Sequence, residues 1–371
     1  MKIKNASVEE FIKYIAGREE RIAVFGLGVI AHTLMNYICE KSKLGERIEI
    51  AVDNDKSKIG KQIELGKTRV IVQPVEALKK IDSENYIIVI TGSHYYEMLC
   101  QLEKMGIENA VCYILPIMCT SHLNLENKAI KRESKEQLIP KKIHYMWFGS
   151  KELPKHLQKC VDSWKRFCPD YKIIRWDEHN YDVTKNNYMK QAYESRQWGF
   201  IPDYARLDIL YENGGIYIDT DVELICGLDD MLYQTGFTST EKWHVINIGG
   251  GTGCIPGHPA IKKILDVRKN VSFIEKDGSY NRMASGYYDT LPFLREGFCM
   301  NGQNQSISGM NIYGFDYFHP YDYMTGELHR TENTLGIHHF NGGWLDENMR
   351  SEREKSIAMY HKTLERMKEL T

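Results

Sequence analysis

The sequence has no uninterrupted apolar run near the ~18 residues that are needed to span a bilayer. Its start, MKIKNASVEEFIKYIAGREE, is charged and amphipathic and lacks the apolar segment of a secretory signal peptide. The formal net charge of −2 provides no overall basic field, so we expect no nucleic acid among the partners. These absences together predict a cytoplasmic protein.

Cysteine pairs at metal-binding spacing are also missing. The nine cysteines form no Cys-x-x-Cys motif and show no regular framework. Zinc sites and disulfide scaffolds usually carry such patterns. We therefore predict reduced thiols, with a zinc or disulfide role as the less favoured alternative.

The 371 residues allow two or three domains. Strand-like and helix-like segments alternate in the first third of the chain, which predicts a doubly wound, Rossmann-like α/β domain over residues 1–120. The polar residues 121–138 predict a linker, and a second domain follows over 139–345. The charged residues 346–371 predict a C-terminal helix.

A short glycine motif follows the first long strand of this domain. Gly26-x-Gly28-x-x-Ala31, with Asp53 at the end of the next strand, fits a dinucleotide fingerprint in which glycines admit a pyrophosphate at a helix N-terminus. The motif alone has low specificity. The domain also resembles Rossmann-like units that accompany bacterial sugar-modifying enzymes. We favour a structural, docking or regulatory role, with nucleotide binding as the alternative.

The stretch NGGIYIDTDVEL, residues 213–224, is predicted to be a buried strand that ends on Asp219 and Asp221. Two neighbouring carboxylates repel each other unless a positive group meets them. Mg²⁺ and Mn²⁺ bind such oxygens together with substrate phosphates. The pair therefore predicts a divalent metal with a diphosphate attached. The alternative for an isolated Asp-x-Asp is a solvated surface turn.

The context of the two aspartates favours the metal site. The stretch IPDYARLDILYENGGIYIDTDVEL resembles the signature of the DxD-containing sugar transferases, most closely glycosyltransferase family 32, and is similar to the clostridial glucosylating toxins. The upstream IPKKIHYMWFG resembles the opening strand of the same family. The residues that carry the signature are Asp203, Arg206, Leu210, Gly214, Gly215, Tyr217, Asp219 and Asp221.

This resemblance implies that the second domain is a GT-A nucleotide-diphospho-sugar transferase with a Mn²⁺ or Mg²⁺ ion. Asp221 is then the main metal ligand, while Asp219 contacts the donor and the metal, directly or through water. Trp147 stacks on the uracil, or else is a buried aromatic at a strand end. Asp203 and Arg206 lie at i and i+3 on one helix face. They hold sugar hydroxyls, with Tyr217 also in the donor site, or else form a structural ion pair.

A third block, GIHHFNGGW, lies near the end of the second domain. In related transferases a C-terminal loop supplies a metal ligand and a tryptophan that close over the donor. The resemblance assigns these roles to His339, with His338 as the alternative, and to Trp344. Core histidines without a ligand role are the other interpretation. The chain departs from the family at Gly343, where a serine is usual.

Two further segments match the family only in part. Asn247, in the glycine-rich INIGGG segment, lies where such folds place an amide beside the anomeric carbon. Ser285 and Gly286 stand where the family often has Thr-Gly-Pro, and the proline is absent.

The leading prediction is a metal-dependent hexosyltransferase that retains anomeric configuration. Its donor is a UDP-sugar, UDP-galactose or UDP-glucose. Its acceptor is a saccharide or lipid of a capsular polysaccharide or glycolipid. No carboxylate nucleophile is evident in the sequence, so we expect the acceptor to attack the face that the diphosphate leaves. The alternatives are an NAD-dependent nucleotide-sugar oxidoreductase or epimerase and a non-catalytic nucleotide-sugar sensor.

Basic residues in and after the linker offer a peripheral contact with the inner membrane face. A solvated charged surface is the alternative that we favour. The residues are Lys128, Lys131, Arg132, Lys135, Lys141 and Lys142.

Overall fold

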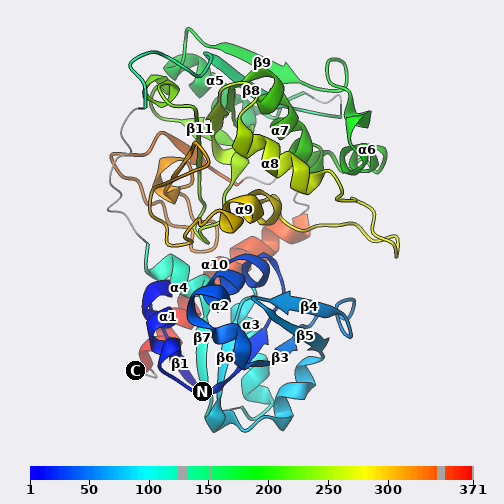
Figure 1. The fold of residues 1–371 in the computed structure, drawn as a ribbon, viewed down its shortest axis with the longest axis vertical. Helices are drawn as coiled ribbons and strands as arrows, with labels where there is room; N and C mark the ends of the chain where they lie inside the picture. The colour runs from blue at the N-terminus through cyan, green and yellow to red at the C-terminus, as the bar shows by residue number, and fades with distance from the viewer. Residues whose placement is uncertain (108, 124–132, 150–151, 341–346, 370–371) are drawn as a thin grey trace.

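The computed structural model describes residues 1–107, 109–123, 133–149, 152–340 and 347–369. Within these residues, no helix combines the length and the apolar character that crossing a bilayer requires. Two seven-stranded sheets dominate the molecule, one in each half of the ribbon (Figure 1).

The first sheet has the strand order β1-β7-β6-β2-β3-β5-β4, and all of its pairings are parallel except that of β4 with β5. Its strands are Lys2–Lys4 (β1), Arg21–Phe25 (β2), Ile48–Val52 (β3), Gln62–Leu65 (β4), Thr68–Gln73 (β5), Tyr86–Ile90 (β6) and Val111–Ile114 (β7). The helices between them are Val8–Ala16 (α1), Ala31–Met35 (η1), Asn36–Ser42 (α2), Leu44–Arg47 (η2), Val75–Lys80 (η3), Ser83–Asn85 (η4), Tyr95–Lys104 (α3) and Leu115–Ser121 (α4).

The path of the chain reverses at β2, which lies between β6 and β3. The burial pattern of β6, in which every residue is buried, is typical of a parallel strand covered on both faces. The predicted doubly wound α/β unit is therefore confirmed. The Gly26 loop follows β2, at the position where such sheets often bind ligands.

The second sheet is mixed, with the order β14-β15-β12-β13-β10-β8-β9. Its strands are Lys142–Met146 (β8), Lys172–Trp176 (β9), Gly215–Tyr217 (β10), Gly236–Ser239 (β12), Thr252–Cys254 (β13), Gln305–Ile307 (β14) and Met310–Tyr313 (β15). A separate antiparallel pair consists of Val222–Leu224 (β11) and Gly336–His338 (β16). The helices of this half are Lys155–Phe167 (α5), Val183–Lys185 (η5), Asn187–Glu194 (α6), Trp198–Phe200 (η6), Pro202–Asn213 (α7), Asp229–Leu232 (η7), Ile248–Gly250 (η8), Pro259–Arg268 (α8), Ser285–Arg295 (α9) and Phe315–Tyr317 (η9).

The connection from α7 to β10 depends on two glycines. Gly214 and Gly215 have φ values of +60° and +92°, a region that strains residues with a Cβ atom. A Cβ atom on Gly214 would also lie 2.7 Å from Pro256 Cδ. The turn sends the chain directly from the helix into β10. Tyr217 then faces the α7 side of the sheet, and Ile216 packs on the opposite side with Trp164.

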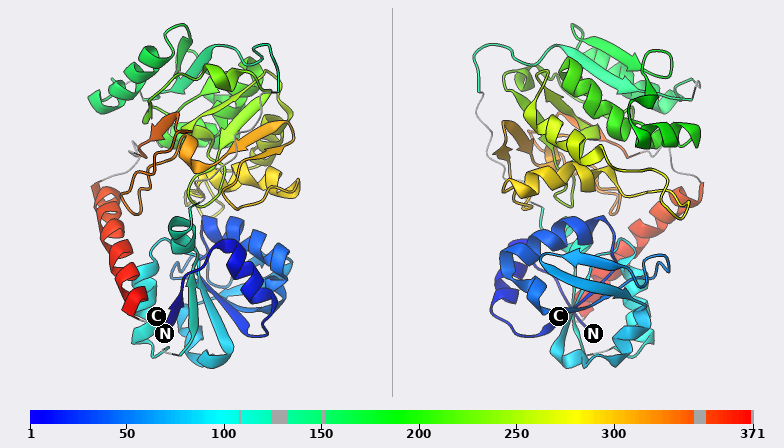
Figure 2. Two further views of the ribbon diagram at one scale, coloured as in Figure 1. Left: turned by 90° about the vertical axis from the view of Figure 1, so that its left-hand side faces the viewer. Right: turned by 45° about the vertical axis from the view of Figure 1, so that its right-hand side comes forward.

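The two halves of the molecule contact each other through helices. α9 packs on η1, where the Tyr287 and His32 rings are 5.9 Å apart. The C-terminal helix Glu347–Glu369 (α10) returns to the first half and contacts α3, as Figure 2 shows from two sides. Buried side chains of both halves form one continuous apolar cluster, which includes Leu34 and Phe293.

His144 on β8 is fully buried and makes two hydrogen bonds within the sheet region. Its Nε2 lies 3.0 Å from the carbonyl oxygen of Gly214, and Trp176 Nε1 donates to its Nδ1 at 3.1 Å. This arrangement requires the neutral imidazole. Burial lowers the pKa of His144 to about 4.

We predict that His144 makes the fold acid-sensitive. An unfolded chain protonates this histidine near pH 6.5, whereas the folded chain does so only near pH 4, so stability falls as the pH drops through this window. At pH 4.5 the expected loss in unfolding free energy from this one group is about 2–3 kcal/mol. Urea unfolding from pH 7 to 4.5 should show a smaller pH dependence for His144→Gln than for the wild type.

The exposed His361 on α10 provides the matched control, because His361→Gln removes an imidazole without removing a buried one. An unchanged pH dependence in His144→Gln would show that His144 is not the acid-sensitive group.

Candidate active site

Asp219 and Asp221 lie in the turn between β10 and β11, at the carboxyl edge of three parallel strands. The sequence predicted a strand that ends on the two aspartates. In the structure β10 ends at Tyr217, so the aspartates follow the strand. The backbone N–H of Asp219 donates to the Gly249 carbonyl oxygen at 2.8 Å, and Val222 N–H donates back to the Asp219 carbonyl oxygen at 3.1 Å. These bonds hold the carboxylates outside the sheet, where a ligand can reach them.

His338 joins the two aspartates. β16 pairs with β11 so that His338 is opposite Val222, directly after the aspartate turn. The nearest ligand atoms of Asp219, Asp221 and His338 all lie within 4.8 Å of one another, and His338 Nε2 is 3.2 Å from Asp221 Oδ1. Two carboxylates and an imidazole suit Mn²⁺ or Mg²⁺, with the nitrogen favouring Mn²⁺. The three side chains therefore fit the metal that the sequence analysis expected.

His339 differs from its expected place. Side chains alternate along a strand, so His339 points away from the aspartates. Its Nε2 is 3.0 Å from Glu223 Oε2, and both side chains of this pair are substantially exposed, at 34% and 46%. The structure thus brings the alternative, His338, to the aspartates and leaves His339 in a surface contact with Glu223.

A third histidine lies behind His338. The Nδ1 atoms of His319 and His338 are 3.3 Å apart, and the Phe340 ring stacks on His338 at 4.0 Å. Burial, with the neighbouring His338, lowers the pKa of His319 well below its usual value. Burial opposes the charge of His338, but the carboxylates of Asp221, Asp219 and Glu241 together outweigh burial and raise the pKa of His338.

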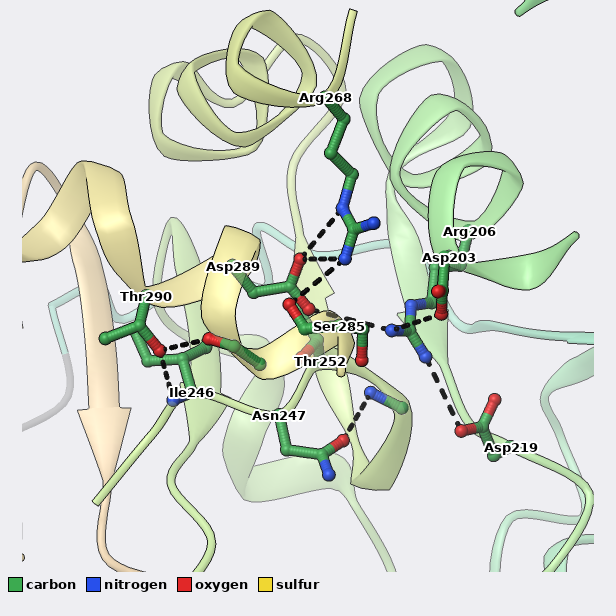
Figure 3. Close-up of polar contacts among 12 residues, drawn as sticks. Asp203, Arg206, Asp219, Ile246, Asn247, Thr252, Arg268, Ser285, Asp289 and Thr290 are labelled. Carbon is green, nitrogen blue, oxygen red and sulfur yellow. Dashed lines mark hydrogen bonds and ion pairs between the residues drawn. The ribbon is translucent and has the colours of Figure 1, made fainter. Parts of the chain in front are cut away.

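Arg206 is the central charge of the site (Figure 3). Its side chain is 4% exposed and lies 3.3 Å from Asp203 Oδ1, 3.6 Å from Asp219 Oδ2 and 3.6 Å from Asp289 Oδ2. Burial opposes this charge, but the carboxylates together raise the pKa of Arg206. Tyr188 donates a hydrogen bond to Asp203 Oδ2 at 3.2 Å. The predicted Asp203–Arg206 pair is thus physically joined to the aspartate turn.

Asp289 and Arg268 extend this network, and no sequence motif indicated either residue. Arg268, from the end of α8, contacts Asp289 Oδ1 at 2.8 and 3.1 Å and the Ser285 carbonyl oxygen at 3.1 Å. Asp289 lies on α9, four residues after Ser285, so the partly matching segment contributes through a residue outside the expected motif. Gly286 packs close to Ile246, with its Cβ position 3.2 Å from the Ile246 carbonyl oxygen.

The glycine-rich loop 247–251 forms the close boundary of the site. A Cβ atom on Gly249 would lie 2.0 Å from Asp219 Oδ2, and one on Gly250 would lie 2.0 Å from His319 Cε1. Asn247 shapes this loop, since its Oδ1 accepts from Gly249 N–H at 3.0 Å and its Nδ2 donates to Glu241 at 3.2 Å. Only glycines allow the loop to approach the aspartate and histidine side chains so closely.

The remaining predicted donor residues lie around this centre. Tyr217 is buried, and its hydroxyl donates a hydrogen bond to Asp219 Oδ1 at 2.7 Å, which helps to orient this carboxylate. Trp147 directly follows β8, at the same carboxyl edge as the aspartate turn. Its backbone N–H donates to the Trp176 carbonyl oxygen at 3.0 Å. Trp344 and Gly343 lie outside the described residues.

The glycine motif of the first half does not join this site. Asp53 Oδ2 accepts from Leu27 N–H at 2.7 Å and pairs with Lys58 at 3.0 Å, so the carboxylate is engaged by its own loop. Gly26 has a φ of +93°, and its Cβ position is 2.9 Å from the Gly92 nitrogen. Gly28 has open space around its Cβ position.

Three of the six basic residues considered for membrane contact lie among the described residues. Lys141 Nζ lies between Asp170 at 2.5 Å and Asp229 at 3.1 Å. Lys135 is exposed and Lys142 is partly buried, while Lys128, Lys131 and Arg132 fall outside the described residues.

A second group of possible metal ligands in the described chain follows β9. It consists of Asp177, Glu178 and His179, here called the β9 cluster. Asp177 pairs with Arg175 at 3.1 Å and with the exposed His179 at 3.1 Å. Arg175 thus pairs with one carboxylate of this cluster, as Arg206 does with Asp219 at the aspartate turn.

Comparisons with known proteins agree with this geometry. Residues 154–238 match the family described as "Glycosyltransferase sugar-binding region containing DXD motif". An uncharacterized glycosyltransferase of Acanthamoeba polyphaga mimivirus is 25% identical over 192 residues, which are 49% of this chain and 74% of the viral protein. Inositol phosphoceramide mannosyltransferase 2 of Schizosaccharomyces pombe is 31% identical over 152 residues, 37% of this chain and 41% of the yeast protein.

The match to a solved structure, the PaToxG glycosyltransferase, covers 54% of this chain and 78% of that chain, at 15% sequence identity and a TM-score of 0.35. The family match spans α5 to β12 and so contains α7, β10 and the aspartate turn. The chain therefore carries the DXD-containing sugar-binding region of the glycosyltransferases, as the resemblance to family 32 had indicated.

Proposed function

We propose that the protein is a metal-dependent, retaining hexosyltransferase that uses a UDP-sugar, UDP-galactose or UDP-glucose, as donor. The observation that carries this proposal is that possible metal ligands and the buried arginine of the sugar-binding region meet at one edge of the sheet. The cluster of Asp219, Asp221 and His338 offers metal ligands, and Asp219 also contacts the buried Arg206 of the sugar-binding region.

Asp221, Asp219 and His338 would hold the metal, which when bound neutralises the charge that develops on the departing diphosphate. Arg206 would hold Asp203 and Asp219 in place, so that both can accept hydrogen bonds from sugar hydroxyls. The Asn247 loop closes one side of the site, and Trp147 offers an aromatic face at the strand edge. Each of these roles places the donor and does not require a covalent intermediate.

The proposal of retention is supported by the engagement of the carboxylates in the site. Asp203, Asp219 and Asp289 all contact Arg206, so each of them already pairs with a guanidinium. We therefore propose that the acceptor hydroxyl attacks the face that the diphosphate leaves, and that the diphosphate takes the proton.

The acceptor is proposed to be a saccharide or lipid of a cell-surface polysaccharide or glycolipid. The name of the yeast relative, inositol phosphoceramide mannosyltransferase 2, pairs a mannosyl group with inositol phosphoceramide, a hexose with a lipid. This pairing supports a hexosyl donor and a lipid acceptor as one choice for this chain. It also makes GDP-mannose a required member of any donor panel.

We predict slow, Mn²⁺-dependent release of the nucleoside diphosphate from one nucleotide sugar. Release should disappear with EDTA and fall on the order of 10²-fold or more in Asp221→Asn, because a metal ligand is lost. A luminescent assay for released UDP or GDP over a donor panel, with lipid and saccharide acceptors added, measures this. Circular dichroism establishes that the variant is folded.

Full activity of folded Asp221→Asn, or turnover that persists in EDTA, would contradict the metal-dependent site. Absence of turnover with every donor and acceptor would favour the sensor alternative.

We predict that His338 and His339 differ sharply in metal binding. Titration of Mn²⁺ in the presence of UDP should show a Kd about 10-fold higher or more for His338→Ala, because an imidazole ligand is removed. His339→Ala is a matched control one residue away, and its Kd should change less than about twofold because its partner is Glu223. The reverse order of effects would restore His339 as the ligand.

For the first half of the chain we propose a structural or docking role in place of NAD binding. The Asp53 carboxylate, which would have to meet a ribose, is engaged by Leu27 N–H and Lys58. Native mass spectrometry of the purified protein should show the polypeptide mass without stoichiometric NAD. NAD at full occupancy would instead support the oxidoreductase alternative.

A further inference from the structure

Asp289 is a fully buried carboxylate that lies between two arginines. Arg268 contacts its Oδ1 at 2.8 and 3.1 Å from one side, and Arg206 lies 3.6 Å from its Oδ2 on the other (Figure 3). All three side chains are at most 4% exposed, so water screens none of these charges. The position of each guanidinium therefore depends on the carboxylate between them.

Arg206 donates a hydrogen bond to Asp203, whereas its contacts with Asp219 and Asp289 are longer ion pairs. Within the described residues, Arg206 Nε and Asp289 Oδ2 are buried without a hydrogen bond. The distances to Asp219 and Asp289 are both 3.6 Å, longer than a good hydrogen bond. Arg206 is thus held largely by the balance of charge between Asp289 on one side and Asp203 and Asp219 on the other.

Removing the Asp289 charge would upset this balance. Arg268 and Arg206 would then face each other without the intervening anion, in a region of low dielectric where repulsion is strong. Arg206 would shift toward Asp203 and Asp219, the residues that are proposed to meet the sugar. The effect would reach the donor site without any contact between Asp289 and the donor.

The next residue of α9 supports the opposite side of the site. Thr290 Oγ1 accepts from Ile246 N–H at 2.9 Å, just before the Asn247 loop. Two consecutive residues of α9 thus contact Arg206 and the segment that leads into the glycine-rich loop.

We propose that Asp289 is a positioning residue for the donor sugar, acting through Arg206. This inference rests on the proposed glycosyltransferase function and adds α9 to the donor site. It assigns Arg268 the role of fixing Asp289, so that a single carboxylate orients the guanidinium that orients Asp203 and Asp219.

The test is Asp289→Asn, which keeps the size of the side chain and removes its charge. We expect kcat/KM for the nucleotide sugar to fall on the order of 10²-fold, mainly through a higher KM. The Kd for UDP with Mn²⁺, measured by calorimetry, should change less than about threefold, since Asp221 and His338, which do not contact Arg206 or Asp289, still hold the metal. A structural defect would instead weaken both.

A double-mutant cycle with Arg206→Lys isolates the route of the effect. If Asp289 acts through Arg206, adding Asp289→Asn to Arg206→Lys should lower kcat/KM no further. Independent, multiplicative losses would overturn the inference. Asp208→Asn is the control, because Asp208 lies on α7, two residues after Arg206, and its carboxylate pairs with Lys185 and Tyr181 rather than with Arg206.

If Asp289→Asn does not fold, Asp289→Glu keeps the charge and displaces the carboxylate by one methylene group. The inference then expects a lower kcat/KM at unchanged UDP affinity, and an unchanged kcat/KM would overturn it. A wild-type protein that turns over no donor contradicts the proposed function itself, and this inference with it. Turnover by the wild type that Asp289→Asn leaves intact contradicts only the role of Asp289.

Discussion

The buried charge of Arg206 is the constraint on which the donor site depends. A guanidinium that is shielded from water must be met by anions, because isolated buried charges are prohibitively costly. Three separate elements supply them: α7 through Asp203, the turn after β10 through Asp219, and α9 through Asp289. The relative placement of these elements is thereby tied to one side chain.

A second requirement is that the glycine-rich loop lies very close to the side chains of the site. The loop at Gly249 and Gly250 can lie against Asp219 and His319 only because these positions lack a Cβ atom. The β11–β16 pair brings His338 to the aspartate turn from late in the chain. Because α9 also packs on η1, the first half of the molecule supports the same helix that supports the donor site. We propose that the first half of the molecule contributes to the site only by supporting α9.

Much of this site could be predicted from sequence because its central residues are close together along the chain. The segment from Asp203 to Asp221 carries helix, glycine turn and aspartates in order, and its place in the fold follows. Asp289 lacks such a local pattern, since a single polar residue on a helix shows its partner only in three dimensions. The choice between His338 and His339 depends on the register of β16 against β11, which the sequence leaves open.

The most direct test of the account is an anomalous difference map at the manganese absorption edge, from crystals grown with MnCl₂ and UDP. The account predicts a strong peak bounded by Asp219, Asp221 and His338. A map with its strongest peak at the β9 cluster, and none at the aspartate turn, would contradict it.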